Sequence, residues 1–145
     1  MKKFIIFNII FIFSIAALFA QSKTYNIYKK CANNNFLRLV SVTINTEETR
    51  ILLEFNPDED QDFTLFEPGT NGAFYISDIA KTKRYDLIDI EGIKYGTWRL
   101  KGGKEYQCTL IFPPINIKRF NLIEGLCATT GDKVAWNFYN VKLEE

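Results

Sequence analysis

The chain of 145 residues contains no histidine at all, and it has only one methionine and four prolines. Without histidine it has no Ser-His-Asp or Cys-His nucleophilic catalysis, no histidine-ligated metal and no imidazole pH switch. Its eight glycines form neither a G-x-G-x-x-G fingerprint nor a P-loop. The commonest hydrolase mechanisms and the glycine-rich nucleotide-binding motifs are therefore excluded.

Serine is also rare, and beyond residue 20 it occurs only as Ser22, Ser41 and Ser77. None of these serines lies in a G-x-S-x-G elbow or an S-x-x-K motif. A pair of carboxylates can still perform acid–base chemistry, as in glycosidases, but nothing in the sequence singles out a pair among 17 acidic residues. We therefore predict a protein that is not an enzyme and that uses no cofactor.

The first twenty residues have the composition of a secretory signal peptide. Lys2 and Lys3 precede an apolar run, Phe4 to Ala20, that only Asn8 and Ser14 interrupt. A short basic region, an apolar core and a small residue at the break are the parts of such a signal. We predict cleavage after Ala20 and an exported protein of the periplasm or cell surface.

No later apolar run approaches the roughly 20 residues that a membrane span needs, so we expect no transmembrane segment in the mature chain. Removal of Lys2 and Lys3 leaves 16 basic against 17 acidic residues. A nearly neutral surface gives no electrostatic reason to bind nucleic acid or anionic lipid.

Bulky aromatic and β-branched residues dominate the remaining chain, and these favour strands. Period-two alternation is clearest in Thr49 to Phe55 and in Glu105 to Phe112. Seven to nine short strands separated by turns predict an all-β fold, a single antiparallel β-sandwich, without helices. We divide the chain into a signal peptide (1–20), a polar N-terminal segment (21–35) with room for a short edge strand, and the sandwich domain (36–145).

The residues on the apolar faces of these strands predict the core. Trp136 is added for its size alone. The predicted core is Val40, Val42, Ile51, Leu53, Phe55, Leu110, Phe112, Leu122 and Trp136.

An acidic cluster and an isolated tryptophan are the strongest local signals for binding. Asp58, Asp60 and Asp62 alternate as at the start of an EF-hand loop, but Phe63 and Gly69 stand where that loop needs Gly and Glu. We interpret the cluster as a solvated tip between two strands. Trp98 lies in a long connection, where a tryptophan is a candidate surface anchor.

Two further aromatic residues, Phe138 and Tyr139, are consecutive in the last strand. Successive side chains of a regular strand point to opposite faces. We therefore expect one of the two to be exposed or covered by a loop.

Three later segments together resemble a known family: Leu110 to Ile115 (LIFPPI), Phe120 to Gly125 (FNLIEG) and Trp136 to Leu143 (WNFYNVKL). They are similar to the C-terminal half of exported bacterial immunoglobulin-like modules, which are largely uncharacterised. The resemblance extends over roughly Leu37 to Leu143 and implies an immunoglobulin-like sandwich. That family has no catalytic motif to transfer, so the resemblance implies a fold and no site residue.

Three cysteines, Cys31, Cys108 and Cys127, leave at least one thiol unpaired in the monomer. Cys108 alternates in phase with Leu110 and Phe112, so we place it in the core. The first and last strands of many sandwiches run side by side, which brings Cys31 and Cys127 to one end of the molecule. An oxidising compartment then favours a Cys31–Cys127 disulfide with Cys108 free.

The leading hypothesis is a non-enzymatic exported module that binds another protein of the cell envelope through a sheet edge or loops. One alternative is a small-ligand or carbohydrate binder that uses Trp98 and neighbouring loops. A carboxylate-based hydrolase is a third, less favoured hypothesis.

Overall fold

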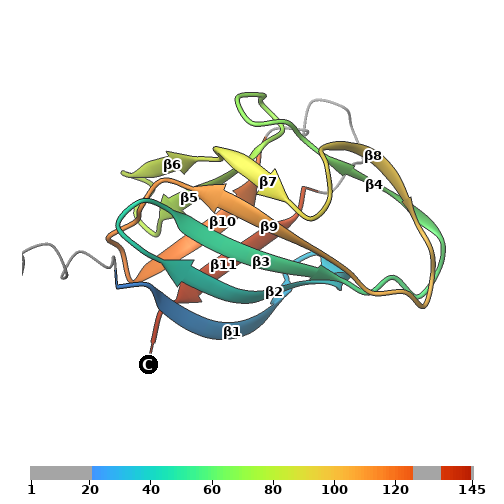
Figure 1. Ribbon diagram of the computed structural model, residues 1–145, viewed down its shortest axis with the longest axis horizontal. Coiled ribbons are helices and arrows are strands. Elements are labelled where there is room, and N and C mark those ends of the chain that lie inside the picture. The colour runs from blue at the N-terminus through green and yellow to red at the C-terminus, as the bar shows by residue number, and fades with distance from the viewer. Residues whose placement is uncertain (1–20, 126–134, 145) are drawn as a thin grey trace, which may run out of the picture.

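The computed structural model describes residues 21–125 and 135–144, and all of its secondary structure there is β. The described strands number eleven, more than the seven to nine predicted. They are β1 (Lys23–Cys31), β2 (Asn34–Ile44), β3 (Thr49–Phe55), β4 (Gln61–Leu65), β5 (Phe74–Asp78), β6 (Arg84–Asp86), β7 (Asp89–Glu91), β8 (Gly96–Leu100), β9 (Tyr106–Phe112), β10 (Arg119–Glu124) and β11 (Asn137–Lys142). The predicted all-β sandwich is confirmed (Figure 1). No helix in this part of the chain is long and apolar enough to cross a membrane.

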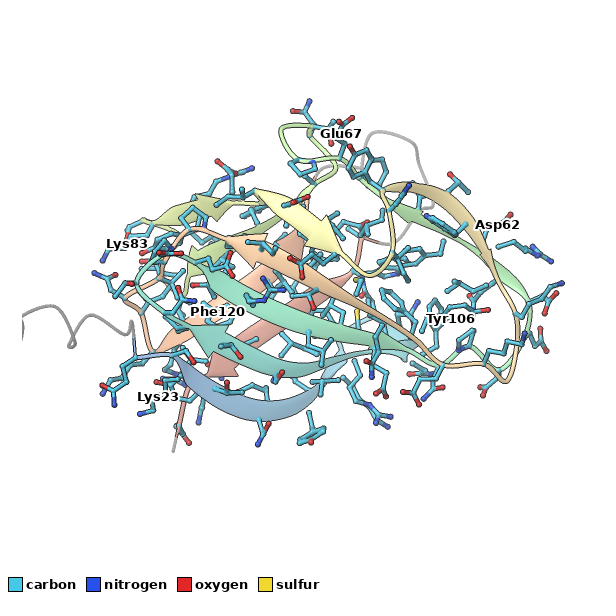
Figure 2. All side chains as sticks on the ribbon, in the orientation of Figure 1. Lys23, Asp62, Glu67, Lys83, Tyr106 and Phe120 are labelled. Carbon is cyan, nitrogen blue, oxygen red and sulfur yellow. The ribbon has the colours of Figure 1, made fainter. Side chains whose placement is uncertain are left out.

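Two antiparallel sheets form the sandwich, and a two-stranded ribbon extends it. The larger sheet has the order β1-β2-β3-β9-β7 and the smaller one β11-β10-β5-β6, while β4 and β8 pair with each other. Side chains from both sheets fill the space between them, and Phe120 of β10 is one of these fully buried residues (Figure 2).

The sequence pattern predicts a single strand from Arg84 to Ile90, but the structure has two strands there. β6 pairs with β5 in the smaller sheet, and β7 pairs with β9 in the larger sheet. Between them the buried Leu87 leads into Ile88, whose backbone N–H donates to the carbonyl of Ile111 at 2.8 Å. The chain therefore crosses from one layer to the other within three residues, too few for periodicity to reveal.

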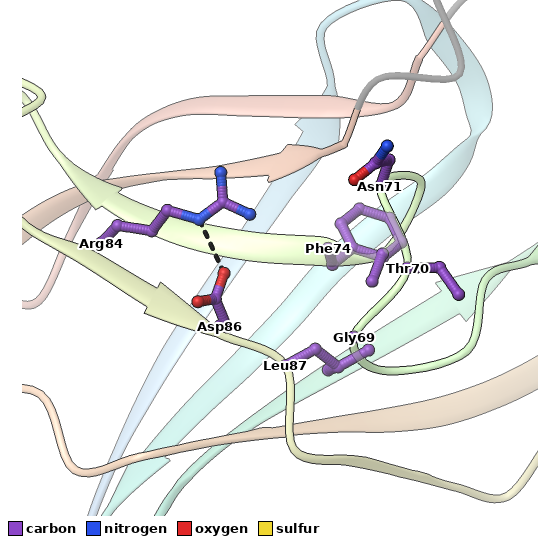
Figure 3. Close-up of a pocket in the computed structure, with 8 residues that line it drawn as sticks. Gly69, Thr70, Asn71, Phe74, Arg84, Asp86 and Leu87 are labelled. Atoms are coloured by element: carbon purple, nitrogen blue, oxygen red, sulfur yellow. Dashed lines mark hydrogen bonds and ion pairs between the residues drawn. The ribbon is translucent and has the colours of Figure 1, made fainter.

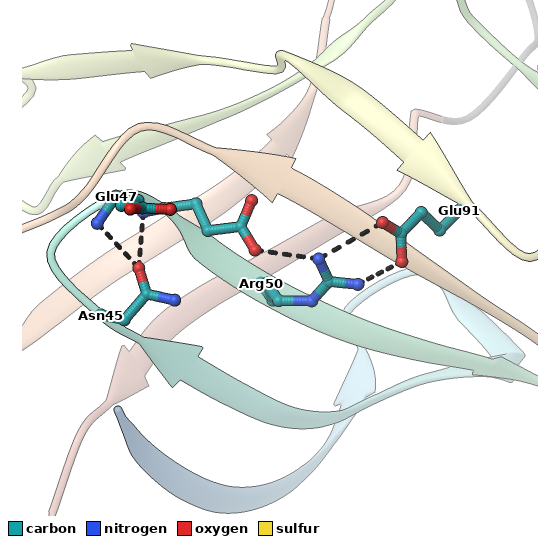
Figure 4. A network of polar contacts seen from close by, with 5 residues as sticks. Asn45, Glu47, Arg50 and Glu91 are labelled. Atoms are coloured by element: carbon teal, nitrogen blue, oxygen red, sulfur yellow. Dashed lines mark hydrogen bonds and ion pairs between the residues drawn. The ribbon is translucent and has the colours of Figure 1, made fainter. Parts of the chain in front are cut away.

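The turn between β2 and β3 is closed by Asn45, whose Oδ1 accepts the backbone N–H groups of Glu47 (2.7 Å) and Glu48 (2.8 Å). Arg50 on β3 then pairs with Glu48 at 2.9 Å and with Glu91 of β7 (Figure 4). These carboxylates raise the pKa of the Arg50 guanidinium. The contact with Glu91 joins two strands that flank β9 on the outer face of the larger sheet.

Seven of the nine predicted core residues are fully buried, and two are not. The confirmed seven are Val42, Ile51, Leu53, Phe55, Leu110, Phe112 and Leu122. Val40 is only half-buried, because a β-bulge between Leu39 and Ser41 reverses the alternation of β2. Leu37 and Leu39 point inward instead. Trp136 is half-buried and packs against the core from its margin.

The polar segment 21–35 contains a nine-residue edge strand, β1, which pairs with β2 along the larger sheet. Its register is shifted between Asn26 and Lys29, and Tyr28 there has a φ of 52°. A bulge with lysines beside it is a common way to discourage pairing at an exposed edge. The possible edge strand of this segment is thus present and is longer than its polar composition suggests.

Candidate functional site

The β4–β8 ribbon continues the pairing of β3 with β9. In the sandwich Phe55 is opposite Tyr106, and in the ribbon Gln61 is opposite Leu100. Five residues, 56–60, separate the two ladders on one side and five, 101–105, on the other, so the register is unchanged. The two pairs of strands are one long β-ribbon that turns back at a bend (Figure 1).

The acidic cluster lies at this bend, and two of its aspartates, Asp60 and Asp62, bind basic residues of the facing segment. Asp60 accepts Lys101 Nζ at 2.7 Å and the backbone N–H of Gly102 at 2.9 Å. These two donors hold the pKa of the Asp60 carboxyl below its ordinary value. Asp62 pairs with Arg99 at 3.1 Å on the ribbon itself (Figure 2).

Glycine is required at position 102, since a Cβ there would lie 2.6 Å from the carbonyl oxygen of Asp58. No group of three acidic, cysteine or histidine side chains within residues 21–125 and 135–144 is arranged to hold a metal ion. Through the contacts of Asp60 with Lys101 and Gly102, the acidic cluster clamps the bend.

One side of the ribbon is anchored on the sandwich by aromatic contacts. Phe63 of β4 is fully buried, stacks on Trp136 at a centroid distance of 4.7 Å and meets Phe55 edge to face at 4.4 Å. Such aromatic pairs stabilise by about 0.5–1.5 kcal/mol beyond their burial. The partly exposed Trp136 thus serves as the surface on which the ribbon rests.

Trp98, the predicted surface anchor, lies on β8 directly opposite Phe63. Its side chain is 41% exposed, and its indole N–H donates to the carbonyl of Lys94 at 2.7 Å. The neighbouring Tyr95 is 48% exposed. The structure therefore gives Trp98 a fixed orientation and an exposed surface, both of which an anchor needs.

The outer edge of β8 has no strand beside it in the part of the chain that the structure describes. Four of its five residues are exposed, and only Leu100 is buried. The outer edge of β4 is also unpaired among the described residues, but Phe63 and Leu65 on that strand are buried in the core. Among the remaining edges, β6 and β7 have three residues each, and β1 is bulged. At the start of β11, the backbone carbonyl of Asn137 already accepts the N–H of Ala32 at 2.8 Å.

Two of the three cysteines, Cys31 and Cys108, lie within the described residues. Cys108 is buried as predicted, and burial raises the pKa of its thiol to about 12. The Sγ of Cys31 has no disulfide partner among the described residues, and its thiol donates to Asn33 Oδ1 at 3.1 Å and to the carbonyl of Asn137 at 3.5 Å. Burial also raises the pKa of Cys31. No disulfide joins the described residues, but Cys127 lies outside them, so the Cys31–Cys127 pairing stays a prediction.

Glu124, at the end of β10, is the only buried carboxyl group among the described residues, and the sequence analysis did not single it out. Burial raises its pKa to about 7 from an ordinary value near 4.5. Its Oε2 accepts the backbone N–H of Trp136 at 2.8 Å, and its own N–H donates to the carbonyl of Trp136 at 3.0 Å. No sequence pattern marks it, because its burial depends on how β10 meets the segment before β11.

No protein-family model matches this chain, and no curated protein or solved structure is significantly similar to it. The fold and the ribbon define the class to which it belongs: an all-β sandwich in which one long hairpin folds back and presents an edge strand. Its function has to be argued from this geometry.

Proposed function

We propose that this protein is an exported binding module of the cell envelope that captures an extended segment of a partner protein on the free edge of β8. The single observation that carries the proposal is an unpaired strand edge that holds an exposed, oriented tryptophan. In β-strand addition, main-chain hydrogen bonds supply affinity and side-chain contacts supply specificity. Trp98 and Tyr95 are the exposed side chains that would make the specific contacts with the partner.

The bend supports this assignment, because it gives the edge a fixed position. The register of β4 with β8 is that of β3 with β9, and the Asp60–Lys101 contact holds the turn. A binding strand that is already ordered loses less conformational entropy when its partner docks. Export rests on the sequence of residues 1–20, which lie outside the described residues.

Site-specific photo-crosslinking in the native host tests the proposal. A crosslinking residue at Thr97, on the exposed part of β8, is expected to give adducts with one envelope protein. A matched residue at Thr24, exposed on the edge strand β1, is expected to give none. Equal adducts at both positions, or none at Thr97, would contradict binding at this edge.

Trp98→Ala in the same experiment separates anchoring from simple proximity. We expect the Thr97 adducts to fall by about tenfold or more, since an aromatic anchor at an interface contributes about 2 kcal/mol or more. Adducts with polysaccharide instead of protein, supported by a glycan array, would favour the carbohydrate hypothesis and reject the one proposed.

A further inference from the structure

A second candidate site lies beside β5 and β6. It is a pocket of about 250 Å³ between the loop that precedes β5 and strand β6 (Figure 3). A water molecule occupies about 30 Å³ of liquid, so the pocket has room for about eight waters or a ligand with a similar number of heavy atoms. The lining residues are Gly69, Thr70, Asn71, Ala73, Phe74, Arg84, Asp86 and Leu87.

Arg84 lies on one wall of this pocket, where two contacts orient its guanidinium. Its Nε donates to Asp86 Oδ1 at 2.6 Å, and its guanidinium carbon lies 3.9 Å from the centre of the Tyr75 ring. Both Nη groups are without a hydrogen-bond partner among residues 21–125 and 135–144, and Figure 3 shows one of them directed toward the side of the pocket where Asn71 and Phe74 lie. A fixed guanidinium with two free terminal nitrogens is a preformed site for a carboxylate.

Asp86 supplies the opposite charge next to this guanidinium. Residues 84 and 86 are two apart on β6 and therefore point to the same face of the strand. Only Oδ1 of Asp86 is bonded to Arg84, which leaves Oδ2 to accept another donor. The wall thus presents one cation and one anion side by side.

The facing wall is also ordered. The hydroxyl of Thr70 donates to the carbonyl of Glu67 at 2.7 Å, and the N–H of Ala73 donates to the carbonyl of Thr70 at 3.2 Å. This turn sets Asn71 at the mouth of the pocket, where its amide offers a donor and an acceptor. The apolar side chains of Phe74 and Leu87, both nearly fully buried, form the floor.

We propose that this pocket binds a free α-amino acid with a small apolar side chain. The ligand carboxylate takes both Nη groups of Arg84, its ammonium takes Oδ2 of Asp86, and its side chain lies on Phe74 and Leu87. A simple anion would meet repulsion from Asp86, and a simple cation would meet repulsion from Arg84. A small zwitterion is the ligand that satisfies both charges at once.

The exposure of the two charged groups sets the strength of binding. Arg84 and Asp86 are 57% and 70% exposed, so solvent screens their contacts with a ligand. We expect a dissociation constant on the order of 1 mM, which requires a method suited to weak binding.

Amide NMR titration of the purified protein with L-valine tests the proposal, because valine has a size that fits the pocket. Saturable shifts are expected in residues 69–87. N-acetyl-L-valine lacks the ammonium and L-valine amide lacks the carboxylate, so each is expected to bind at least tenfold more weakly. Absence of saturable shifts, or equal binding of either blocked derivative or of glucose, would overturn the assignment.

The ribbon contains a matched control pair. Arg99 and Asp62 form an ion pair of 3.1 Å whose members are 56% and 67% exposed, nearly the same as the pair in the pocket. Arg84→Gln and Asp86→Asn are each expected to weaken L-valine binding at least tenfold, whereas Arg99→Gln and Asp62→Asn leave it unchanged. Equal effects of both sets of variants, with folding verified from the dispersion of each spectrum, would contradict a site at Arg84.

Discussion

The buried side chain of Glu124 accepts the backbone N–H of Trp136, and the same two residues also share a main-chain hydrogen bond. This double contact fixes the chain where it enters β11. It does so with a carboxyl group whose pKa burial raises to about 7. Its ionisation within the folded protein is therefore costly at neutral pH.

The sign of the resulting pH dependence follows from that raised pKa. Below about pH 4.5 the carboxyl is protonated in both the folded and the unfolded chain, so its contribution to stability is fully present. Between about pH 4.5 and 7 the unfolded chain ionises first, and the free energy of unfolding falls. A shift of this size corresponds to roughly 3 kcal/mol, which is lost once the pH exceeds about 7.

Glu124→Gln keeps an acceptor for the N–H of Trp136 and removes the titration. Urea unfolding of this variant is expected to show up to roughly 3 kcal/mol more stability than wild type at pH 8, and little difference at pH 4. Glu47→Gln, an exposed residue, is the control and should follow wild type throughout. A pH profile of Glu124→Gln that parallels wild type would show that this carboxyl does not titrate as described.

Phe138 and Tyr139 are neighbours in β11 that face opposite sides, as expected: Phe138 is fully buried and Tyr139 is 50% exposed. Phe138→Ala is predicted to lower the free energy of unfolding by about 3–5 kcal/mol, through lost burial and the cavity left behind. Tyr139→Ala should change it by about 0.5 kcal/mol. Thermal or urea unfolding measures both, and similar losses in the two variants would mean that the register of β11 is wrong.

Asp60 is predicted to control the order of the folded-back ribbon more than the stability of the sandwich. Asp60→Ala removes the contacts with Lys101 and Gly102, so amide hydrogen exchange should become faster in β4 and β8. Exchange in β3 and β9 should remain slow, because their pairing lies inside the sheet. Glu59→Ala in the same loop is the control. Unchanged exchange in the ribbon of Asp60→Ala would refute the clamp.

The reactivity of the thiols tests the burial of Cys108 and the predicted pairing of Cys127. Cys108 is 1% exposed and its pKa is about 12, so it should resist alkylation at pH 8 until the protein is unfolded. Non-reducing peptide mapping of native material tests the predicted Cys31–Cys127 disulfide. A Cys108-containing cross-link, or three free thiols, would refute that pairing.

Local patterns in the sequence determined much of the sandwich. The alternating segments Thr49 to Phe55 and Glu105 to Phe112 contain strands β3 and β9. The apolar residues that alternate in them are buried: Ile51, Leu53, Phe55, Leu110 and Phe112. Regular alternation succeeds there because each strand is paired on both sides and faces one core. It failed at Val40, because a bulge adds one residue without leaving a mark in the composition.

The tertiary structure alone decided the features on which function depends. The shared register of β3–β9 and β4–β8, the exposed edge of β8 and the burial of Glu124 all arise from segments far apart in the chain. The pocket joins the turn at Thr70 and Asn71 to Arg84 and Asp86 on β6. Periodicity shows only which face of a strand is apolar. To locate a site, one must also know which strands become neighbours in the fold.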